Sequence, residues 1–388
     1  MSIKAYPTAW AEDAALREAA GRWQRLGWLA APQRAAIEAA YPQQYYRPGN
    51  WLRLGLLLAT GFGISSAGIS TTLTLGLNSY LVASLLLLAG AGGLLEVIIR
   101  RSKHYYSGVD NALLYAALGA WAAFWTEVFD KLHTVPASTT LTVWALAGPS
   151  LLVLLLAVVR YAEPLVAAAA YATAGALLVA TVLAAEWGVL LLPFALALAA
   201  GALLLLLQRL AQRADFLYYR PALGVLRALA LATLYVAGNY LILLELLAKS
   251  DGPGFPAWAM ALFWVPTVLV PLLYVALGLR RADRLLLWLG LLGLGVSVYT
   301  FRLHHAVLPP ALAATLAGAL LTGLALGLLR YLRTPRYGLT AAADTEARPL
   351  VNLESFVQLE TAHVPGPPVP GFEFGGGSSG GGGAQGQF

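Results

Sequence analysis

The sequence predicts an all-α, polytopic transmembrane helical bundle, because it combines ten long apolar stretches, few charges and a one-sided distribution of basic residues. Hydrophobic residues make up 59% of the 388 positions and charged residues only 11%, whereas about a quarter of an ordinary soluble domain is charged. A chain with so few charges cannot cover its core with a water-facing surface. We therefore expect lipid to contact much of this protein.

The apolar stretches have the length of helices that cross a bilayer. A helix rises 1.5 Å per residue, so about 20 residues are needed to cross ~30 Å of hydrocarbon. The expected spans are residues 54–76, 80–99, 109–129, 139–159, 164–185, 189–207, 224–247, 257–279, 285–301 and 306–329.

Basic residues collect on one side when the ten spans are threaded in turn. Of the 25 Lys and Arg residues, 22 then fall on the side of the N-terminus, and only Lys131, Lys249 and Arg302 fall on the other. Cytoplasmic loops of membrane proteins carry such an excess. The distribution predicts a bacterial cytoplasmic (inner) membrane protein with both termini in the cytoplasm, and it explains the net charge of +6 without a nucleic-acid partner.

The chain divides into three regions. Residues 1–50 form a cytoplasmic segment with expected helices at Thr8–Trp23 and from Pro32, and its aromatic residues suit packing on the membrane or on helix ends. Residues 51–334 form the transmembrane domain. Residues 335–388 are rich in Gly and Pro and should be disordered, serving as a tether or as a binding segment for a protein partner.

The N-terminal region resembles a known family. The Trp-Gln-Arg-Leu-Gly-Trp run at Trp23 to Trp28, the helix expected at Gln33 to Tyr41, and the Gly- and Ala-rich first span are similar to the bacterial predicted membrane proteins grouped as DUF family 2157. The resemblance covers about the first hundred residues. It implies a membrane protein, and it supplies neither an activity nor functional residues.

An internal duplication is suggested by landmarks that recur at a nearly constant offset. The pair Glu127 and Lys131 recurs as Glu245 and Lys249, 118 residues later, and a tyrosine pair precedes or opens each block. Two four-span units, residues 100–213 and 214–334, would then share one orientation, as in some transporters. The alternative is that similar loop lengths and basic turns coincide.

Polar residues inside the spans are the candidate site. An ionisable group within an apolar span is costly and calls for a reason. Glu127 and Glu245 each have a lysine four residues later on the same helical face, Lys131 and Lys249 respectively. The two pairs, together with Asn239, would line a polar cavity that opens outside. The alternative is that each glutamate reaches the headgroups beside its own lysine.

Two other features of the spans are open to a functional or a structural interpretation. Glu96 beside Arg100, and Asp110 at the start of the third span, are expected to extend towards the membrane surface like the pairs above. Pro149, Pro266 and Pro271 interrupt two spans, and the carbonyls that they free could coordinate an ion or a substrate. The alternative is that these prolines are tolerated in packed membrane helices without any ligand.

Enzyme and cofactor signatures are absent from the sequence. It contains no HExxH motif, phosphate-binding glycine loop with Lys or G-x-S-x-G elbow. It has no cysteine, and the adjacent His304 and His305 diverge by about 100 degrees on a helix, so we expect no catalytic residue, metal or cofactor. Two functions remain: a carrier of a small solute or ion, or a non-enzymatic membrane scaffold acting through its cytoplasmic segments.

Overall fold

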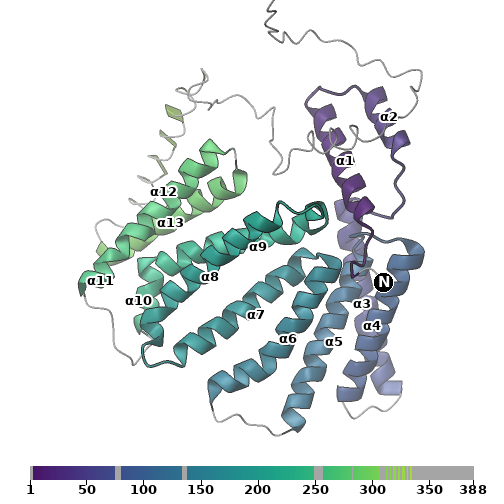
Figure 1. Ribbon diagram of the computed structural model, residues 1–388, viewed down its shortest axis with the longest axis horizontal. Coiled ribbons are helices and arrows are strands. Elements are labelled where there is room, and N and C mark those ends of the chain that lie inside the picture. The colour runs from purple at the N-terminus through teal and green to yellow at the C-terminus, as the bar shows by residue number, and fades with distance from the viewer. Residues whose placement is uncertain are drawn as a thin grey trace, which may run out of the picture. The chain divides into compact units, whose positions relative to one another are not determined.

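The computed structural model describes residues 3–74, 80–132, 138–248, 257–281 and 283–305, together with separate positions between 312 and 333. Every regular element in these ranges is an α-helix, which confirms the all-α prediction (Figure 1). The two short helices expected before the first span are present. The helices are α1 Thr8–Arg25, α2 Ala31–Ala40, α3 Asn50–Thr74, α4 Tyr80–Ser102, α5 Val109–Lys131, α6 Thr139–Tyr161, α7 Pro164–Leu183, α8 Gly188–Leu210, α9 Phe216–Gly238, α10 Tyr240–Ala248, α11 Ala257–Leu262, α12 Trp264–Arg280 and α13 Arg284–His305.

Nine helical segments of the described part are long and apolar enough to cross a membrane. They correspond to the first nine expected spans, with α11 and α12 together supplying the eighth. The chain is a multi-pass membrane protein. The tenth expected span, 306–329, lies mostly outside the described residues, and the tail 335–388 lies wholly outside them.

Helices that are neighbours in the sequence also pack together. α4 packs on α5, α6 on α7, α8 on α9 and α12 on α13, while α9 also contacts α7, α12 and α13 (Figure 1). Glycine permits the closest approach at α12 and α13, because a Cβ at Gly290 would lie 2.7 Å from the main-chain nitrogen of Val275. Side chains larger than glycine would force these two helices apart.

The seventh span differs from the expected helix 224–247. It begins earlier, at Phe216, and it is interrupted at Asn239, whose extended main chain (φ −83°, ψ 126°) separates α9 from α10. The eighth span is interrupted as well, at Phe263 between α11 and α12. Both interruptions fall inside apolar segments, where main-chain polar groups must find protein partners.

The proline in the fourth span shows how such a partner is supplied. Pro149 has no N–H, so the carbonyl of Ala145 loses the donor that an α-helix would provide. The indole Nε1 of Trp125, on α5, donates to that carbonyl at 2.9 Å. The freed carbonyl is therefore satisfied by the neighbouring helix, which favours the structural interpretation of Pro149.

A double-mutant cycle tests this pairing. Trp125→Phe removes the indole donor and should lower the free energy of unfolding by about 1–2 kcal/mol, because it leaves a buried carbonyl unpaired. In a Pro149→Ala background the same change should cost less, because the N–H of residue 149 can now bond to Ala145. Thermal unfolding in detergent measures both. Equal costs in the two backgrounds would contradict the pairing.

Candidate functional site

The interruption between α9 and α10 is built around the buried side chain of Asn239. Its Oδ1 accepts the N–H groups of Leu241 and Ile242 at 3.0 and 3.3 Å, so it caps the start of α10. Its Nδ2 donates to the hydroxyl of Tyr235 at 3.0 Å. The residue has no exposed surface, so the amide replaces water for the main-chain groups that the break would leave unpaired.

Thr267 on α12 joins the two interrupted spans. Its Oγ1 accepts the N–H of Tyr240 at 2.8 Å, and it donates to the carbonyl of Phe263 at 2.7 Å. The first of these bonds satisfies the opening N–H of α10. The carbonyl of Phe263 also accepts the N–H of Thr267 at 3.2 Å, so the hydroxyl adds a second bond at the break between α11 and α12. One buried hydroxyl therefore stabilises both interruptions.

α13 contributes the third part of this polar cluster. Pro271 deprives the carbonyl of Thr267 of its helical donor, and the hydroxyl of Ser297 donates to that carbonyl instead. Ser297 also lies 3.1 Å from the hydroxyl of Tyr235, which donates to the carbonyl of Gly293 at 2.9 Å. We call Tyr235, Asn239, Thr267 and Ser297 the break cluster.

Aromatic rings cover one side of the break cluster. Tyr240 stacks on Trp264 with ring centroids 4.5 Å apart, and both rings contact His304. His304 therefore has aromatic neighbours, and no group of three or more His, Asp or Glu residues suited to a metal occurs in the described ranges. The break cluster thus offers uncharged oxygen and amide groups.

The sequence-predicted site residues have separate surroundings. Glu127 pairs with Lys131 at 3.2 Å on α5, as expected, with a quarter of the glutamate side chain exposed. Glu245 is exposed on α10, and Lys249 lies outside the described residues. α5 packs on α3, α4 and α6, whereas α10 packs on α8 and α9. Of the expected set, Asn239 joins the break cluster, and the shared cavity of the two glutamates stays a prediction.

Thr267, Ser297 and Tyr235 were not predicted as site residues. One signal was available, because Pro271 follows Thr267 by four residues and must free its carbonyl. The donor, Ser297, could not be chosen from several hydroxyl side chains without knowing how α12 and α13 pack. The sequence therefore indicated the need for a partner without identifying it.

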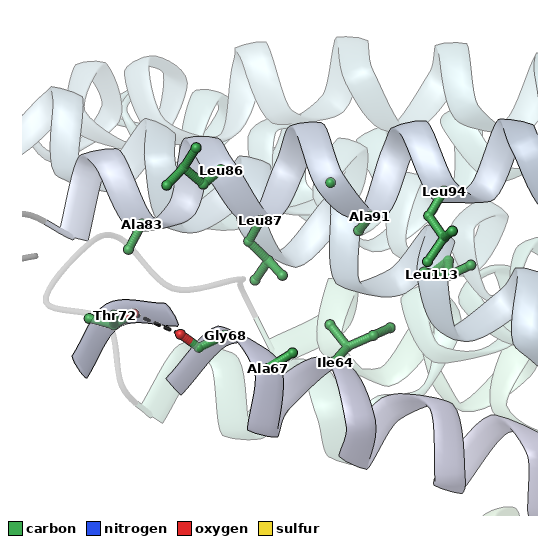
Figure 2. A pocket seen from close by; sticks show the side chains of 11 residues that line it. Ile64, Ala67, Gly68, Thr72, Ala83, Leu86, Leu87, Ala91, Leu94 and Leu113 are labelled. Carbon is green, nitrogen blue, oxygen red and sulfur yellow. Dashed lines mark hydrogen bonds between the residues drawn. The ribbon is translucent and has the colours of Figure 1, made fainter. Parts of the chain in front are cut away.

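Two pockets among α3 to α6 have apolar linings. Figure 2 shows the first, of about 290 Å³, between α3 and α4. The hydroxyl of its Thr72 donates to the carbonyl of Gly68 on the same helix. The second, of about 240 Å³, lies between α4, α5 and α6 and has Arg160 at one end. Apolar walls suit lipid chains better than a polar solute.

The arginine-rich ends of the helices hold a second cluster, where the N-terminal segment packs. Tyr6 and Trp10 contact the rings of Tyr105 and Tyr106, which follow α4. The N–H of Ala5 donates to the carbonyl of Arg160 at 2.9 Å, and Lys4 pairs with Asp215 at 3.0 Å. Of the N-terminal aromatic residues, Trp10 and Tyr45 are therefore packed against helix ends, as expected, whereas Trp28 and Trp51 are exposed. We call this region the tyrosine hub; its buried rings are Tyr6, Trp10, Tyr45, Tyr105, Tyr106, Tyr161 and Tyr218.

Asp110 lies at the centre of the tyrosine hub, which corrects its expected position at the membrane surface. It is 1% exposed. Its carboxylate accepts the hydroxyl of Tyr6 at 2.8 Å, the N–H groups of Tyr106 and Ser107 at 2.8 Å each, and the Ser107 hydroxyl at 3.0 Å. Four donors replace water around this carboxylate. The local sequence could not predict this burial, because Tyr6, which covers Asp110, lies 104 positions away.

Burial of the tyrosine hub affects its titrating groups. It raises the pKa of Tyr105 to about 12, although Arg47 acts in the opposite direction. Burial, followed by the charge of Asp110, raises the pKa of Tyr6 above its ordinary range. Burial lowers the pKa of His104, because it disfavours the charged ring, although Asp110 acts against this. Burial therefore favours the neutral forms of Tyr6, His104 and Tyr105.

The pairing predicted for Glu96 is present, together with two partners that were not predicted. It pairs with Arg100 at 3.2 Å, as expected, but it also accepts from Arg160 at 2.7 Å and from the hydroxyl of Tyr161 at 2.7 Å. One carboxylate is thus shared by two arginines on different helices, α4 and α6.

Comparisons with models of protein families, with curated proteins and with solved structures find no match for this chain. The similarity to DUF family 2157 stays an expectation from the N-terminal residues. The function of this chain is therefore inferred from the break cluster, the pockets and the tyrosine hub.

The bond between Tyr6 and Asp110 should be a main support of the N-terminal segment. Tyr6→Phe removes a hydrogen bond to a buried carboxylate, and we expect the free energy of unfolding to fall by about 1.5–3 kcal/mol. Tyr41→Phe is the control, because Tyr41 is 57% exposed and its change should stay within about 0.5 kcal/mol. Denaturation followed by tryptophan fluorescence measures both, and equal effects would contradict the assignment.

His104 should make the tyrosine hub sensitive to acid. Its folded pKa lies below the free value of about 6.5, so between these two pKa values the unfolded chain binds the extra proton and stability falls as the pH falls. We expect His104→Gln to reduce the drop in melting temperature between about pH 7 and pH 5. An unchanged pH dependence would exclude His104 as its source.

Proposed function

We propose that this chain is a carrier of a small polar solute or a monovalent cation, and that the break cluster is its binding segment. The observation that carries the proposal is the interruption of two adjacent spans, at Asn239 and at Phe263, with both breaks meeting at Thr267. Interrupted helices with exposed main-chain ends form the solute sites of many carriers. A purely structural bundle gains nothing from two such breaks.

The chemistry of the break cluster suits a neutral or singly charged solute. Its groups are hydroxyls, one amide and the main-chain carbonyls of Gly238, Phe263 and Gly293. Oxygen atoms of this kind coordinate hard cations or bond to polar solutes. A multiply charged solute would lack compensating charge in an apolar surrounding.

The internal bonds of the break cluster are of a kind that a solute can replace. The N–H of Tyr240 bonds to the hydroxyl of Thr267, and this hydroxyl shares the carbonyl of Phe263 with the main-chain N–H of Thr267. A solute that carries a hydroxyl, or a hydrated cation, could accept the N–H of Tyr240 and bond to the hydroxyl of Thr267, and the carbonyl of Phe263 would keep its main-chain donor. The exchange would cost little, since equivalent hydrogen bonds are lost and gained.

We also place the carrier in a bacterial cytoplasmic membrane, with both termini inside. The excess of basic residues on the N-terminal side supports the orientation, and the N-terminal resemblance supports the source. In this orientation the tyrosine hub lies in the cytoplasm and covers the inner ends of α5, α6 and α9.

A membrane scaffold is the second candidate, favoured by the two pockets. Both have apolar linings, whereas a carrier open to one side would show a polar path. A scaffold would use the exposed surface of α2 or the C-terminal tail to bind a protein partner. Deleting residues 364–388 should then change the set of co-purifying proteins.

Transport by the purified full-length chain in proteoliposomes distinguishes the two candidates. The solutes to test are Na⁺, K⁺ and radiolabelled neutral amino acids and sugars. At least one should enter faster than into protein-free liposomes, and Thr267→Val should slow its entry about tenfold, since loss of a hydrogen bond of ~1.4 kcal/mol corresponds to that factor.

Thr72→Val is the matched control for this experiment. The hydroxyl of Thr72 donates to the carbonyl four residues earlier, as that of Thr267 does. The bond of Thr72 lies within α3, whereas the hydroxyl of Thr267 also accepts the N–H of Tyr240 from another helix. Its substitution should leave the rate unchanged. Wild-type liposomes that match protein-free liposomes for every solute would contradict the carrier and leave the scaffold.

A further inference from the structure

The pocket between α4, α5 and α6 differs from the other apolar pocket by its charged end. Its walls are apolar side chains such as Leu88, Leu114 and Val153, and it reaches Arg160 and Tyr161 at the end of α6. From Val153 to Arg160 the groove follows two turns of α6, a length of about 10 Å at 1.5 Å per residue. The pocket of Figure 2 has an uncharged lining throughout.

The charge at the Arg160 end is not balanced by the local carboxylate. Arg100 and Arg160 both pair with Glu96, so two cations share one anion. Arg160 also donates to the carbonyl of Ile3 at 3.0 Å, and its side chain is 30% exposed, whereas that of Arg100 is 57% exposed. Part of each guanidinium group is therefore accessible to a group in the interface. Guanidinium groups match the geometry of phosphate oxygens.

We propose that this groove is a binding site for an anionic phospholipid of the leaflet on the Arg160 side. One acyl chain lies along the groove between α4, α5 and α6, and the phosphate lies beside Arg100 and Arg160. Basic pockets between membrane helices select anionic headgroups in this way. The groove and the positive end are both required, because the apolar walls alone would accept any lipid. The proposal does not depend on transport.

Two adjacent glycines of α4 provide a matched test of the groove. Gly92 lines it, whereas Gly93 does not. A Cβ at either position meets no atom within 4 Å, so neither Gly92→Leu nor Gly93→Leu should force the main chain to move. Only the first should fill the space that the acyl chain occupies.

The experiment measures binding of phosphatidylglycerol and of phosphatidylcholine with identical acyl chains to the detergent-solubilised full-length chain. Native mass spectrometry and the shift in melting temperature are the readouts, since a bound ligand stabilises the folded state. The wild type and Gly93→Leu should retain phosphatidylglycerol in preference to phosphatidylcholine. Gly92→Leu should lose this retention and the accompanying shift.

The charged end is tested by a second pair of variants. Arg100→Gln should reduce the preference for phosphatidylglycerol about tenfold, corresponding to ~1.4 kcal/mol, while Arg101→Gln should leave it unchanged. This arm remains decisive if Gly92→Leu fails to fold, as judged by size-exclusion chromatography and helical circular dichroism. Equal retention of the two lipids by the wild type, or equal effects within either pair of variants, would overturn the proposal.

Discussion

The constraint that organises this structure is that main-chain polar groups inside apolar spans need partners from the protein. An unpaired group there costs several kcal/mol. Where prolines remove a donor, Trp125 satisfies the carbonyl of Ala145 and Ser297 satisfies that of Thr267. These donors belong to other helices, so each bond fixes the depth and rotation of one helix against another. The prolines that interrupt the spans thereby help to determine how the helices pack.

Helix starts follow the same rule with carboxylates as partners. Asp110 lies in the first turn of α5, Glu163 accepts the N–H of Val166 at the start of α7, and Asp283 accepts the N–H groups of Leu285 and Leu286 at the start of α13. Negative charge is also favoured there by the helix dipole. The carboxylate of Asp110 accepts the N–H groups of Tyr106 and Ser107 and the hydroxyl of Tyr6, so the turn before α5 and the docking of the N-terminal segment depend on one side chain.

The sequence predicts those features that depend on neighbouring residues. Composition and length located the spans, and the ion pairs of Glu96 with Arg100 and of Glu127 with Lys131 follow from a spacing of four on one helix. Contacts between distant residues were missed. The second partner of Glu96, Arg160, lies 64 positions away, and no periodicity indicates which internal turns meet.

Asn239 shows, within one span, the same difference between what neighbouring residues predict and what distant contacts decide. A lone asparagine in an apolar run indicated a polar contact, and the structure confirms that it is buried. The interruption itself was not predicted, because the run continues to Ala248 without proline or glycine after Gly238. An extended residue is tolerated there only because Thr267, from a different span, bonds to Tyr240.

The proposed duplication gives these interruptions a common context. α6 and α11 begin 118 residues apart, α7 and α13 begin 120 apart, and Glu163 and Asp283 cap the latter two helices. At the 118-residue offset, Asn239 corresponds to Trp121 and Thr267 corresponds to Pro149. If the two units are copies, each has a bond between neighbouring spans, from Trp125 to Ala145 in one and from Tyr240 to Thr267 in the other. In the first unit α5 is unbroken, whereas in the second α9 and α10 are separated at Asn239, whose amide is buried. A packed bundle could use the unbroken arrangement in both units, so the difference at Asn239 supports a specialised role for the second unit.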